Sequence, residues 1–144
     1  MAVSEGIMSI KVLTLIRGLP GSGKSHLARS MATQSWSEGG PWVHHWETDQ
    51  FFVDKTTGEY RFNPEQIKSK HMECQTQVEK SMLNGTLHVV VSNTFSRRWE
   101  MQPYVELAVK YGYMIQEVTV KADFGNEHNV PQDVIDRMRA RWEP

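Results

Sequence analysis

Glycines, a lysine and a serine stand close together near the amino terminus. The stretch is GLPGSGKS, and four residues separate Gly18 from the run Gly23, Lys24 and Ser25. This spacing, placed between an apolar run and a helical segment, is the P-loop pattern. Glycine lets the backbone approach an anion with no Cβ in the way, so that successive N–H groups point inward. The stretch therefore predicts a phosphate-binding loop.

The residues of this loop have separate expected roles. We expect Lys24 to reach the β and γ phosphates of a nucleoside triphosphate and Ser25 to place its hydroxyl on Mg²⁺, so that ATP and Mg²⁺ are the predicted cofactors. The helix that begins at Lys24 would direct the positive end of its dipole at the phosphates. The alternative is a glycine-rich turn that binds nothing. Ser25 is the predicted metal ligand, and the predicted nucleotide contacts are Gly18, Gly21, Ser22, Gly23, Lys24, Ser25 and His26.

Composition indicates one globular domain, residues 1–144. The chain of 144 residues is long enough for one hydrophobic core and too short for two. Its 39% hydrophobic and 23% charged residues are ordinary for such a domain. No uncharged apolar stretch has membrane-spanning length, and the first ten residues lack the pattern of a secretory signal. We therefore expect a cytoplasmic protein with no membrane partner.

Net charge and the count of cysteines limit which kinds of binding site the chain can contain. The net charge is −1, so binding of nucleic acid would depend on a local basic patch. The single cysteine, Cys74, forms no internal disulfide and no paired-cysteine metal site, and we expect it in the core. His44 and His45 are neighbours on an expected strand, where they point to opposite faces, so a shared metal is not favoured. We interpret both histidines as structural.

Hydrophobic periodicity predicts strands that alternate with helices. Continuous apolar runs, typical of strands buried on both faces, predict the strands, and spacings of three and four predict the helices. This order favours a three-layer α/β/α fold around a mostly parallel sheet. A turn is expected at Thr57 and Gly58. The expected strands are 10–16, 42–46, 87–91 and 113–120, and the expected helices are 24–32, 64–84, 103–111 and 130–142.

Parallel α/β folds bind ligands beyond the carboxyl ends of their strands. This rule gathers the glycine-rich loop, residues 47–49 and residues 92–94 at one edge. Asp49 is the candidate general base for an attacking hydroxyl. Glu47 competes with it, because residues two apart share one side of an extended segment. A turn-capping role is the alternative for Asp49.

The polar residues after the third strand have two possible roles. Asn93 and Thr94 would bind the acceptor or a metal-bound water at the predicted edge. Both are also ordinary turn-forming residues after a strand. The sequence favours neither reading.

Six stretches together resemble the polynucleotide-kinase-like branch of P-loop kinases. They are GLPGSGKS, the strand ending in TDQFF, GEYRFNP, VVVSNT, EMQPYVELAVKYGY and EHNVPQDVIDRM, and they span nearly the whole chain. This branch includes the kinase domain of phage polynucleotide kinases and the P-loop domains of NEDD4-binding-protein-like proteins. The resemblance implies a four-stranded parallel core. It also implies Asp49 as the general base, Thr94 beside the acceptor, and residues 21–25 around the triphosphate and Mg²⁺.

The chain departs from this family's pattern at three places. Gln50 stands where a second aspartate is usual, and Asn93 stands in the usual Asp-Thr-Asn segment. Gly125, in the shortened lid FGNEHNVP, stands where an arginine usually stabilises the transition state. Another cation should replace this arginine, and we hypothesise that Arg137 does so. The other candidates are Arg97, Arg98, Arg139 and Arg141.

The acceptor side also departs from the phage enzymes that phosphorylate 5′ ends. Phe51 and Phe52 follow Asp49 where those enzymes carry an arginine for the terminal phosphate of the substrate. Aromatic rings suit stacking on a base, and core packing is their alternative role. Some phage relatives phosphorylate 5-hydroxymethyluracil in DNA, and a compact lid would fit that substrate. The predicted acceptor contacts are Asp49, Phe52, Thr94 and Arg97.

These observations predict an ATP-dependent kinase. Lys24, Asp49 and Arg137 are its predicted catalytic residues. The expected acceptor is a nucleic acid, with DNA favoured, phosphorylated either on 5-hydroxymethyluracil of phage DNA or at a 5′-hydroxyl end. A phage-encoded protein would act in the host cytoplasm. The alternative is a nucleotide-binding module or weak ATPase without transferase activity, which the missing second acidic position and lid arginine favour. The oligomeric state is not predicted.

Overall fold

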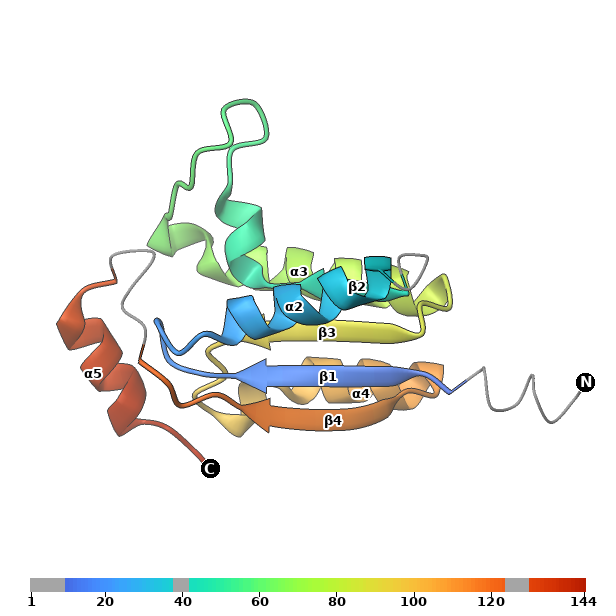
Figure 1. Ribbon diagram of the computed structural model, residues 1–144. Helices are drawn as coiled ribbons and strands as arrows, with labels where there is room; N and C mark the ends of the chain where they lie inside the picture. The colour runs from blue at the N-terminus through green and yellow to red at the C-terminus, as the bar shows by residue number, and fades with distance from the viewer. Residues whose placement is uncertain (1–9, 38–41, 124–129) are drawn as a thin grey trace, which may run out of the picture.

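Four parallel strands form the centre of the fold (Figure 1). The computed structural model describes residues 10–37, 42–123 and 130–144. Within these residues the sheet has the strand order β2-β3-β1-β4, and every pairing is parallel. This agrees with the predicted α/β fold. The strands are β1 (Val12–Arg17), β2 (Val43–Trp46), β3 (His88–Asn93) and β4 (Met114–Thr119).

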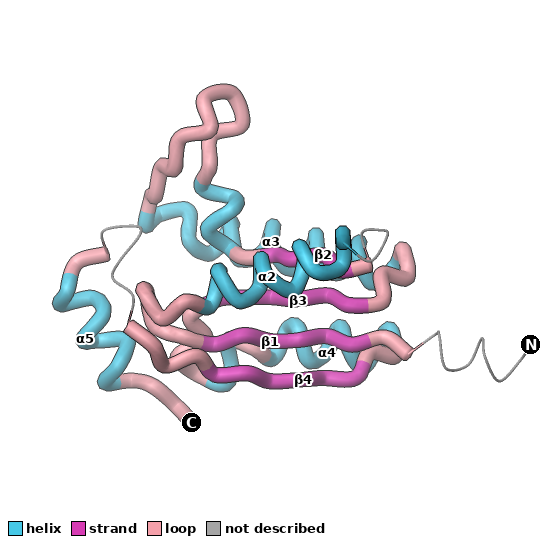
Figure 2. Tube along the Cα trace, viewed as in Figure 1, coloured by secondary structure: helices cyan, strands magenta, loops and turns pink. Residues whose placement is uncertain are grey.

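Helices cover both faces of this sheet. Figure 2, which colours helices and strands differently, shows how they alternate along the chain, as the apolar periodicity predicted. Short 3₁₀ helices mark the chain where it leaves β2, enters α3 and enters α4. The helices are α2 (Lys24–Ser37), α3 (Ile67–Leu83), α4 (Gln102–Tyr111) and α5 (Gln132–Ala140), and the 3₁₀ helices are η1 (Thr48–Phe52), η2 (Pro64–Gln66) and η3 (Arg98–Glu100).

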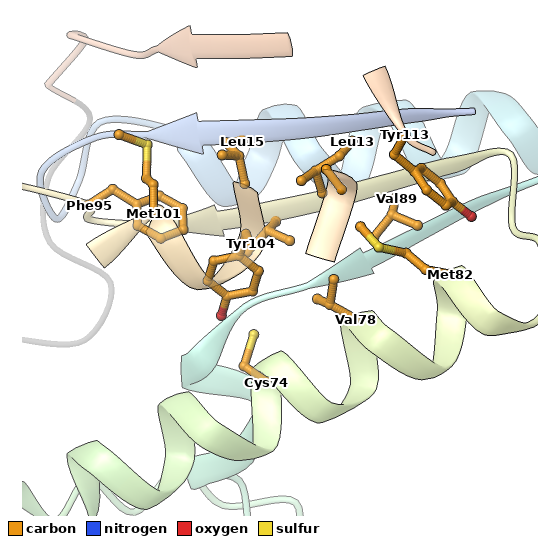
Figure 3. Close-up of a cluster of buried hydrophobic side chains, with 12 residues drawn as sticks. Leu13, Leu15, Cys74, Val78, Met82, Val89, Phe95, Met101, Tyr104 and Tyr113 are labelled. Atoms are coloured by element: carbon orange, nitrogen blue, oxygen red, sulfur yellow. The ribbon is translucent and has the colours of Figure 1, made fainter. Parts of the chain in front are cut away.

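The larger core lies between the sheet and the pair α3 and α4 (Figure 3). Leu13 and Leu15 of β1 face it and are at most 1% exposed. Cys74 of α3 and Tyr104 of α4 are buried in the same cluster, which confirms the expected core position of the cysteine. Leaving such apolar side chains in water would cost roughly 1.5–3 kcal/mol each. Their burial therefore fixes both helices on this face.

A smaller core lies on the opposite face, under α2. Ile16 of β1, Val90 of β3 and Ala28 of α2 are buried together there. Since side chains alternate along a strand, Leu15 and Ile16 serve different cores. The two cores make the sheet the middle of three layers, as the sequence predicted.

Local signals set several helix ends. Asn63 accepts a hydrogen bond from the Glu65 N–H at 3.0 Å, and the turn it caps is 3₁₀ before α3 begins. Gly112 ends α4 with φ 75°, a conformation that glycine adopts at low cost. Helix α2 runs to Ser37, five residues beyond its expected end. Capped ends were therefore predicted more closely than the uncapped one.

Two segments stand apart from the layered body in Figure 1. Helix α5 lies beyond the carboxyl ends of the strands. The segment 53–63, between η1 and α3, projects as a narrow hairpin with Gly58 at its tip, where φ is 73°. An antiparallel bridge joins Val53 to Tyr60 across it. Within the described residues, none of the helices has the length and apolar character needed to cross a bilayer.

Candidate active site

The glycine-rich loop connects β1 to α2 with two residues of positive φ. Gly21 has φ 83° and Gly23 has φ 92°, a region that side chains with a Cβ rarely occupy. The Leu27 N–H already donates to the Gly23 carbonyl at 3.0 Å, so helical bonding begins inside the loop. The N-terminus of α2 is therefore directed at the concave side of a phosphate-binding loop.

Gly18 is required by close packing. A Cβ at this position would lie 2.2 Å from Ser22 Oγ and 3.0 Å from the Val120 carbonyl oxygen. Ser22 is 2% exposed, and its N–H donates to the Leu19 carbonyl at 3.1 Å. Its hydroxyl has no hydrogen-bond partner among the described residues. Ser22, a predicted nucleotide contact, thus serves to close the loop in this structure.

Ser25 lies against the carboxylate of Glu47. Its Oγ donates to Glu47 Oε2 at 2.6 Å, and Ser92 Oγ donates to the same oxygen at 2.8 Å. Ser25 is in the first turn of α2, Glu47 follows β2, and Ser92 is on β3. Three elements therefore meet at one carboxylate oxygen, as the strand-end rule predicted.

His45 completes this group. Its Nε2 lies 2.7 Å from Ser92 Oγ and 3.5 Å from Glu47 Oε2. Burial alone raises the pKa of Glu47, but hydrogen bonds from His45, Ser25 and Ser92 outweigh it and lower that pKa to about 2. Glu47 is therefore an anion at neutral pH, with its charge directed at the hydroxyl that was predicted to bind Mg²⁺.

Asp49 has a different neighbour from Glu47. The Tyr60 hydroxyl donates to Asp49 Oδ1 at 3.2 Å. We expected the two acidic residues on one side of an extended segment, and this was wrong. The chain enters the 3₁₀ helix η1 at Thr48, so the segment is not extended at Asp49, and the two carboxylates have different hydrogen-bond partners.

The end of β3 and the residue after it join the same edge. Asn93 Oδ1 accepts the Thr48 N–H at 2.9 Å, and the Thr94 carbonyl accepts the Gly18 N–H at 3.3 Å. Asn93 is 8% exposed, and its Nδ2 lacks a partner within the described part of the chain. Asn93 thus connects β3 to η1, while the side chain of Thr94 is partly exposed.

A cavity of about 400 Å³ lies beside the loop. Residues of the loop form one wall, the end of β4 forms a second, and α5 forms the third. Arg139 is the arginine of α5 that lines it. The lining residues are Leu19, Pro20, Ser22, Thr119, Val120, Lys121, Ala122, Asp123, Gln132, Ile135, Arg139 and Trp142.

Arg137, the predicted replacement for the lid arginine, lies on α5 with Arg139. Arg137 does not line this cavity, and its exposed side chain pairs with Asp133 at 3.3 Å. Arg141 donates to Ser96 Oγ at 2.9 Å. Arg139, two residues on, lines the cavity and pairs with Asp136 at 3.4 Å.

Other predicted residues also differ in exposure from the expectation. Phe52 is 5% exposed and belongs to the interior, so its ring is not presented to an acceptor. Phe51 packs on Trp46 with ring centroids 6.2 Å apart. Arg97 and His26 are exposed. The lid departure at Gly125, and the rest of the segment 124–129, fall outside the described residues.

The site fits a nucleotide with Mg²⁺. A hydroxyl and a carboxylate supply the oxygen donors that Mg²⁺ prefers, with phosphate and water completing its shell. No group of three His, Cys, Asp or Glu side chains suited to a metal occurs in the described ranges, so a metal cage made of protein alone is not found there. Ser25 and Glu47 would hold the ion together with the phosphates.

Sequence reasoning missed the roles of Glu47, Ser92, His45 and Tyr60. The signal for two of them was present. His45 and Glu47 are two apart on an extended segment, so their side chains share a face. Tyr60 carried no such signal, because its contact with Asp49 depends on how the 53–63 hairpin folds back.

The fold and this edge define a P-loop kinase-like α/β domain. A model of the AAA domain family, AAA_33, matches residues 13–144. The chain belongs to this family.

One curated relative and two solved structures show what the chain is similar to. Human NEDD4-binding protein 2 is 35% identical over 104 residues, which are 72% of this chain and 6% of that protein. A chain of the Pnkp1/Rnl/Hen1 RNA repair complex matches with TM-score 0.57 at 19% identity, over 90% of this chain and 36% of that one. The APS kinase CysC of Mycobacterium tuberculosis matches with TM-score 0.57 at 15% identity, over 91% and 94%. The chain thus spans only a small part of the human relative.

Proposed function

We propose that the chain is a kinase that transfers the γ-phosphoryl group of ATP to a hydroxyl of a nucleic acid. The observation that carries this proposal is the arrangement of two carboxylates beside one phosphate loop. Glu47 lies 2.6 Å from the hydroxyl of Ser25, and Asp49 is two residues further on with a different partner. The proposal assigns Glu47 to the metal and Asp49 to the acceptor hydroxyl.

The roles follow from charge and position. Lys24 and the N–H groups of the loop hold the phosphates, and Ser25 with Glu47 holds Mg²⁺, which supplies charge neutralisation when bound. Asp49 orients the acceptor hydroxyl and accepts its proton. A bond forms between the acceptor oxygen and the γ phosphorus, the bond to the oxygen that bridges the β phosphate breaks, and ADP leaves.

Arg139 and the cavity suit the donor side. The cavity beside the loop can hold the nucleoside, and Arg139 on its wall can stabilise charge on the transferring group. This replaces the role hypothesised for Arg137. Donor and acceptor then approach the phosphate loop from different sides.

A nucleic acid acceptor is supported by resemblance. The RNA repair complex and NEDD4-binding protein 2 are among the proteins that the chain resembles. The acceptor hydroxyl is either at a 5′ end or on 5-hydroxymethyluracil in DNA. A nucleotide-binding module without transferase activity is the second candidate, and Asn93 in place of an acidic residue favours it.

The first experiment is a transfer assay with γ-labelled ATP and Mg²⁺. The acceptors are 5′-hydroxyl DNA, 5′-hydroxyl RNA, duplex DNA containing 5-hydroxymethyluracil, and nucleosides. Stoichiometric label on a polynucleotide supports the proposal and identifies the hydroxyl. Label on nucleosides alone excludes a polynucleotide acceptor. Release of phosphate without labelled acceptor, or binding of ATP alone, favours the second candidate.

Asp49→Asn tests the assignment of the base. We expect it to lower turnover by roughly 10²- to 10⁴-fold, the usual contribution of a general base, while ATP binding is retained. Glu106→Gln removes an exposed carboxylate on α4 and serves as the matched control. Turnover of Asp49→Asn equal to that of Glu106→Gln would show that Asp49 is not the base.

A further inference from the structure

The 53–63 hairpin, here called the arm, is ordered by its own hydrogen bonds. The Asp54 N–H donates to the Glu59 carbonyl at 2.8 Å, and the Gly58 N–H donates to the Asp54 carbonyl at 2.7 Å. At its base the Arg61 N–H donates to the Phe52 carbonyl at 2.8 Å. Figure 1 shows the arm projecting from the layered body. A projecting segment with this much internal bonding is a formed structural element.

Aromatic rings connect the arm to η1. Phe52 is buried, and its ring centroid lies 5.1 Å from that of Phe62 and 6.3 Å from that of Tyr60. Phe62 is 52% exposed. The buried ring of Phe52 therefore supports a second ring that is half open to solvent. Phe52 was predicted to contact the acceptor, but it is buried and packs against the ring of Phe62.

A hydrogen bond connects the arm to the candidate base. The hydroxyl of Tyr60 donates to Asp49 Oδ1 at 3.2 Å. Burial, and then the negative charge of Asp49, raise the pKa of Tyr60, so the phenol keeps its proton at neutral pH. One arm therefore carries an exposed ring and, two residues earlier, a hydrogen-bond donor to the carboxylate that receives the acceptor proton.

We propose that the arm recognises the acceptor: Phe62 stacks on an unpaired base of the nucleic acid, and Tyr60 positions Asp49 for the hydroxyl. This proposal depends on the function proposed above. Every base has a π face, and an aromatic platform binds it without requiring one sequence.

The surroundings of Phe62 favour a base over a protein partner. A stable protein interface buries about 800 Å² on each side, far more than one half-exposed ring offers. Arg61, the residue before Phe62, pairs with Glu59 at 3.1 Å. Both partners are more than 60% exposed, and such a pair is weak enough for Arg61 to exchange it for a backbone phosphate.

The ring is tested by Phe62→Ala and Phe62→Trp, with Leu83→Ala as the control. Leu83 is 65% exposed at the far end of α3, so its truncation also removes exposed apolar surface. The measurement is binding of a labelled single-stranded oligonucleotide by anisotropy, with ATP binding measured alongside. We expect Phe62→Ala to weaken oligonucleotide binding by about 5- to 150-fold and Phe62→Trp to retain it, with ATP affinity unchanged.

Binding and transfer separate the two proposals. If the wild-type protein binds the oligonucleotide and phosphorylates no acceptor, the proposed kinase function fails, while the effect of Phe62→Ala on binding still decides the role of the ring. Equal affinities of Phe62→Ala and Leu83→Ala would overturn the proposed stacking. Failure of the wild-type protein to bind any single strand would do the same.

Tyr60→Phe tests the positioning role. It keeps the ring that packs on Phe52 and removes the hydroxyl that meets Asp49. We expect kcat to fall by about tenfold, with the KM for the acceptor and the melting temperature unchanged, because a charge-assisted hydrogen bond is lost without loss of packing. A change in KM alone, or no change in either constant, would contradict positioning by Tyr60.

Discussion

The hydroxyl of Ser25 lies 2.6 Å from Glu47 Oε2. Ser25 is in the first turn of the helix that follows the phosphate loop, and Glu47 directly follows β2. This contact joins the phosphate loop after β1 to the end of β2, across the edge of the sheet. An ion held by both groups would replace the proton between them. Under the proposed function, Mg²⁺ binding would therefore depend on Glu47 as well as on Ser25.

Glu47→Gln should reduce the contribution of Mg²⁺ to nucleotide binding. The amide is neutral and is a poorer magnesium ligand than a carboxylate. The measurement is the dissociation constant of ADP, determined by calorimetry with and without Mg²⁺. We expect the ratio of the two constants to fall by at least tenfold in the variant, with the constant measured without Mg²⁺ little changed. Loss of a supporting residue alone typically costs about 10- to 100-fold in metal affinity. An unchanged magnesium effect would place the ion elsewhere.

His45 should affect Mg²⁺ binding indirectly, through its contact with Ser92. Its Nε2 lies 2.7 Å from Ser92 Oγ, and Ser92 donates to Glu47. His45→Phe removes this support and should raise the Mg²⁺ concentration for half-maximal ADP binding by about 10- to 100-fold. His45→Gln keeps a polar group near Ser92, so its half-maximal Mg²⁺ concentration should lie between those of the wild type and His45→Phe.

The control for this pair is His44→Gln, since His44 is on the same strand and its Nδ1 lies 3.0 Å from Ser81 Oγ. Thermal melting of each variant separates a folding defect from an effect on the ion. A purely structural role of His45 would lower the melting temperature and leave the magnesium dependence of the folded protein as it is in the wild type.

The layered fold was predictable because its signals are local or continuous. β1 and β3 are buried on both faces, so their sequences are almost uninterrupted apolar runs. The phosphate loop has a spacing that few other structures require. Where a cap was present, as at Asn63 or Gly112, the helix end was also predicted closely.

The details of the site were less predictable because they depend on small rotations of the chain. One turn of 3₁₀ helix at Thr48 gave Glu47 and Asp49 different partners, although their spacing of two suggested a shared side. A helix turns about 100° per residue, so which of Arg137 and Arg139 lines the cavity depends on how α5 packs. The turn at Thr48 has local hydrogen bonds, from the Glu47 N–H to Gln50 Oε1 at 3.2 Å and from the Gln50 N–H to the Glu47 carbonyl at 3.1 Å. The position of α5 depends on contacts distant in sequence, such as that of Arg141 with Ser96.

Arg17 should be necessary for stability although it is charged. It is 1% exposed, its Nε and Nη2 donate to the Phe95 carbonyl at 3.0 and 2.8 Å, and its guanidinium lies 4.5 Å from the centre of the Trp142 ring. Phe95 has φ 48°, a strained conformation for a residue with a side chain. Arg17 thus holds the turn after β3 and the segment after α5 together.

Arg17→Leu should therefore lower the free energy of unfolding by about 2 kcal/mol or more, since a buried carbonyl left without a donor costs about 1–3 kcal/mol. Urea denaturation measures this. Arg29→Leu, at an exposed position on α2, is the matched control and should change stability by less than about 0.5 kcal/mol. Equal effects of the two substitutions would show that the Arg17 contacts contribute no net stability.

His88 should make stability depend on pH. It lies at the start of β3, where its Nε2 is 2.7 Å from the hydroxyl of Thr14, and burial lowers its pKa below the usual 6.5. The unfolded chain therefore takes up a proton at a higher pH than the folded chain does. It follows that stability is fully present above about pH 6.5 and is lost as the pH falls through the lowered pKa of the folded state.

His88→Gln removes this titration and keeps a polar side chain at the position. Urea unfolding at pH 7.5, 6.5 and 5.5 should show the wild-type protein losing stability relative to His88→Gln as the pH falls. His71, whose pKa burial also lowers, is present in both proteins, so its contribution cancels in the difference. A difference that stays constant across these pH values would mean that His88 is protonated as easily in the folded chain as in the unfolded one.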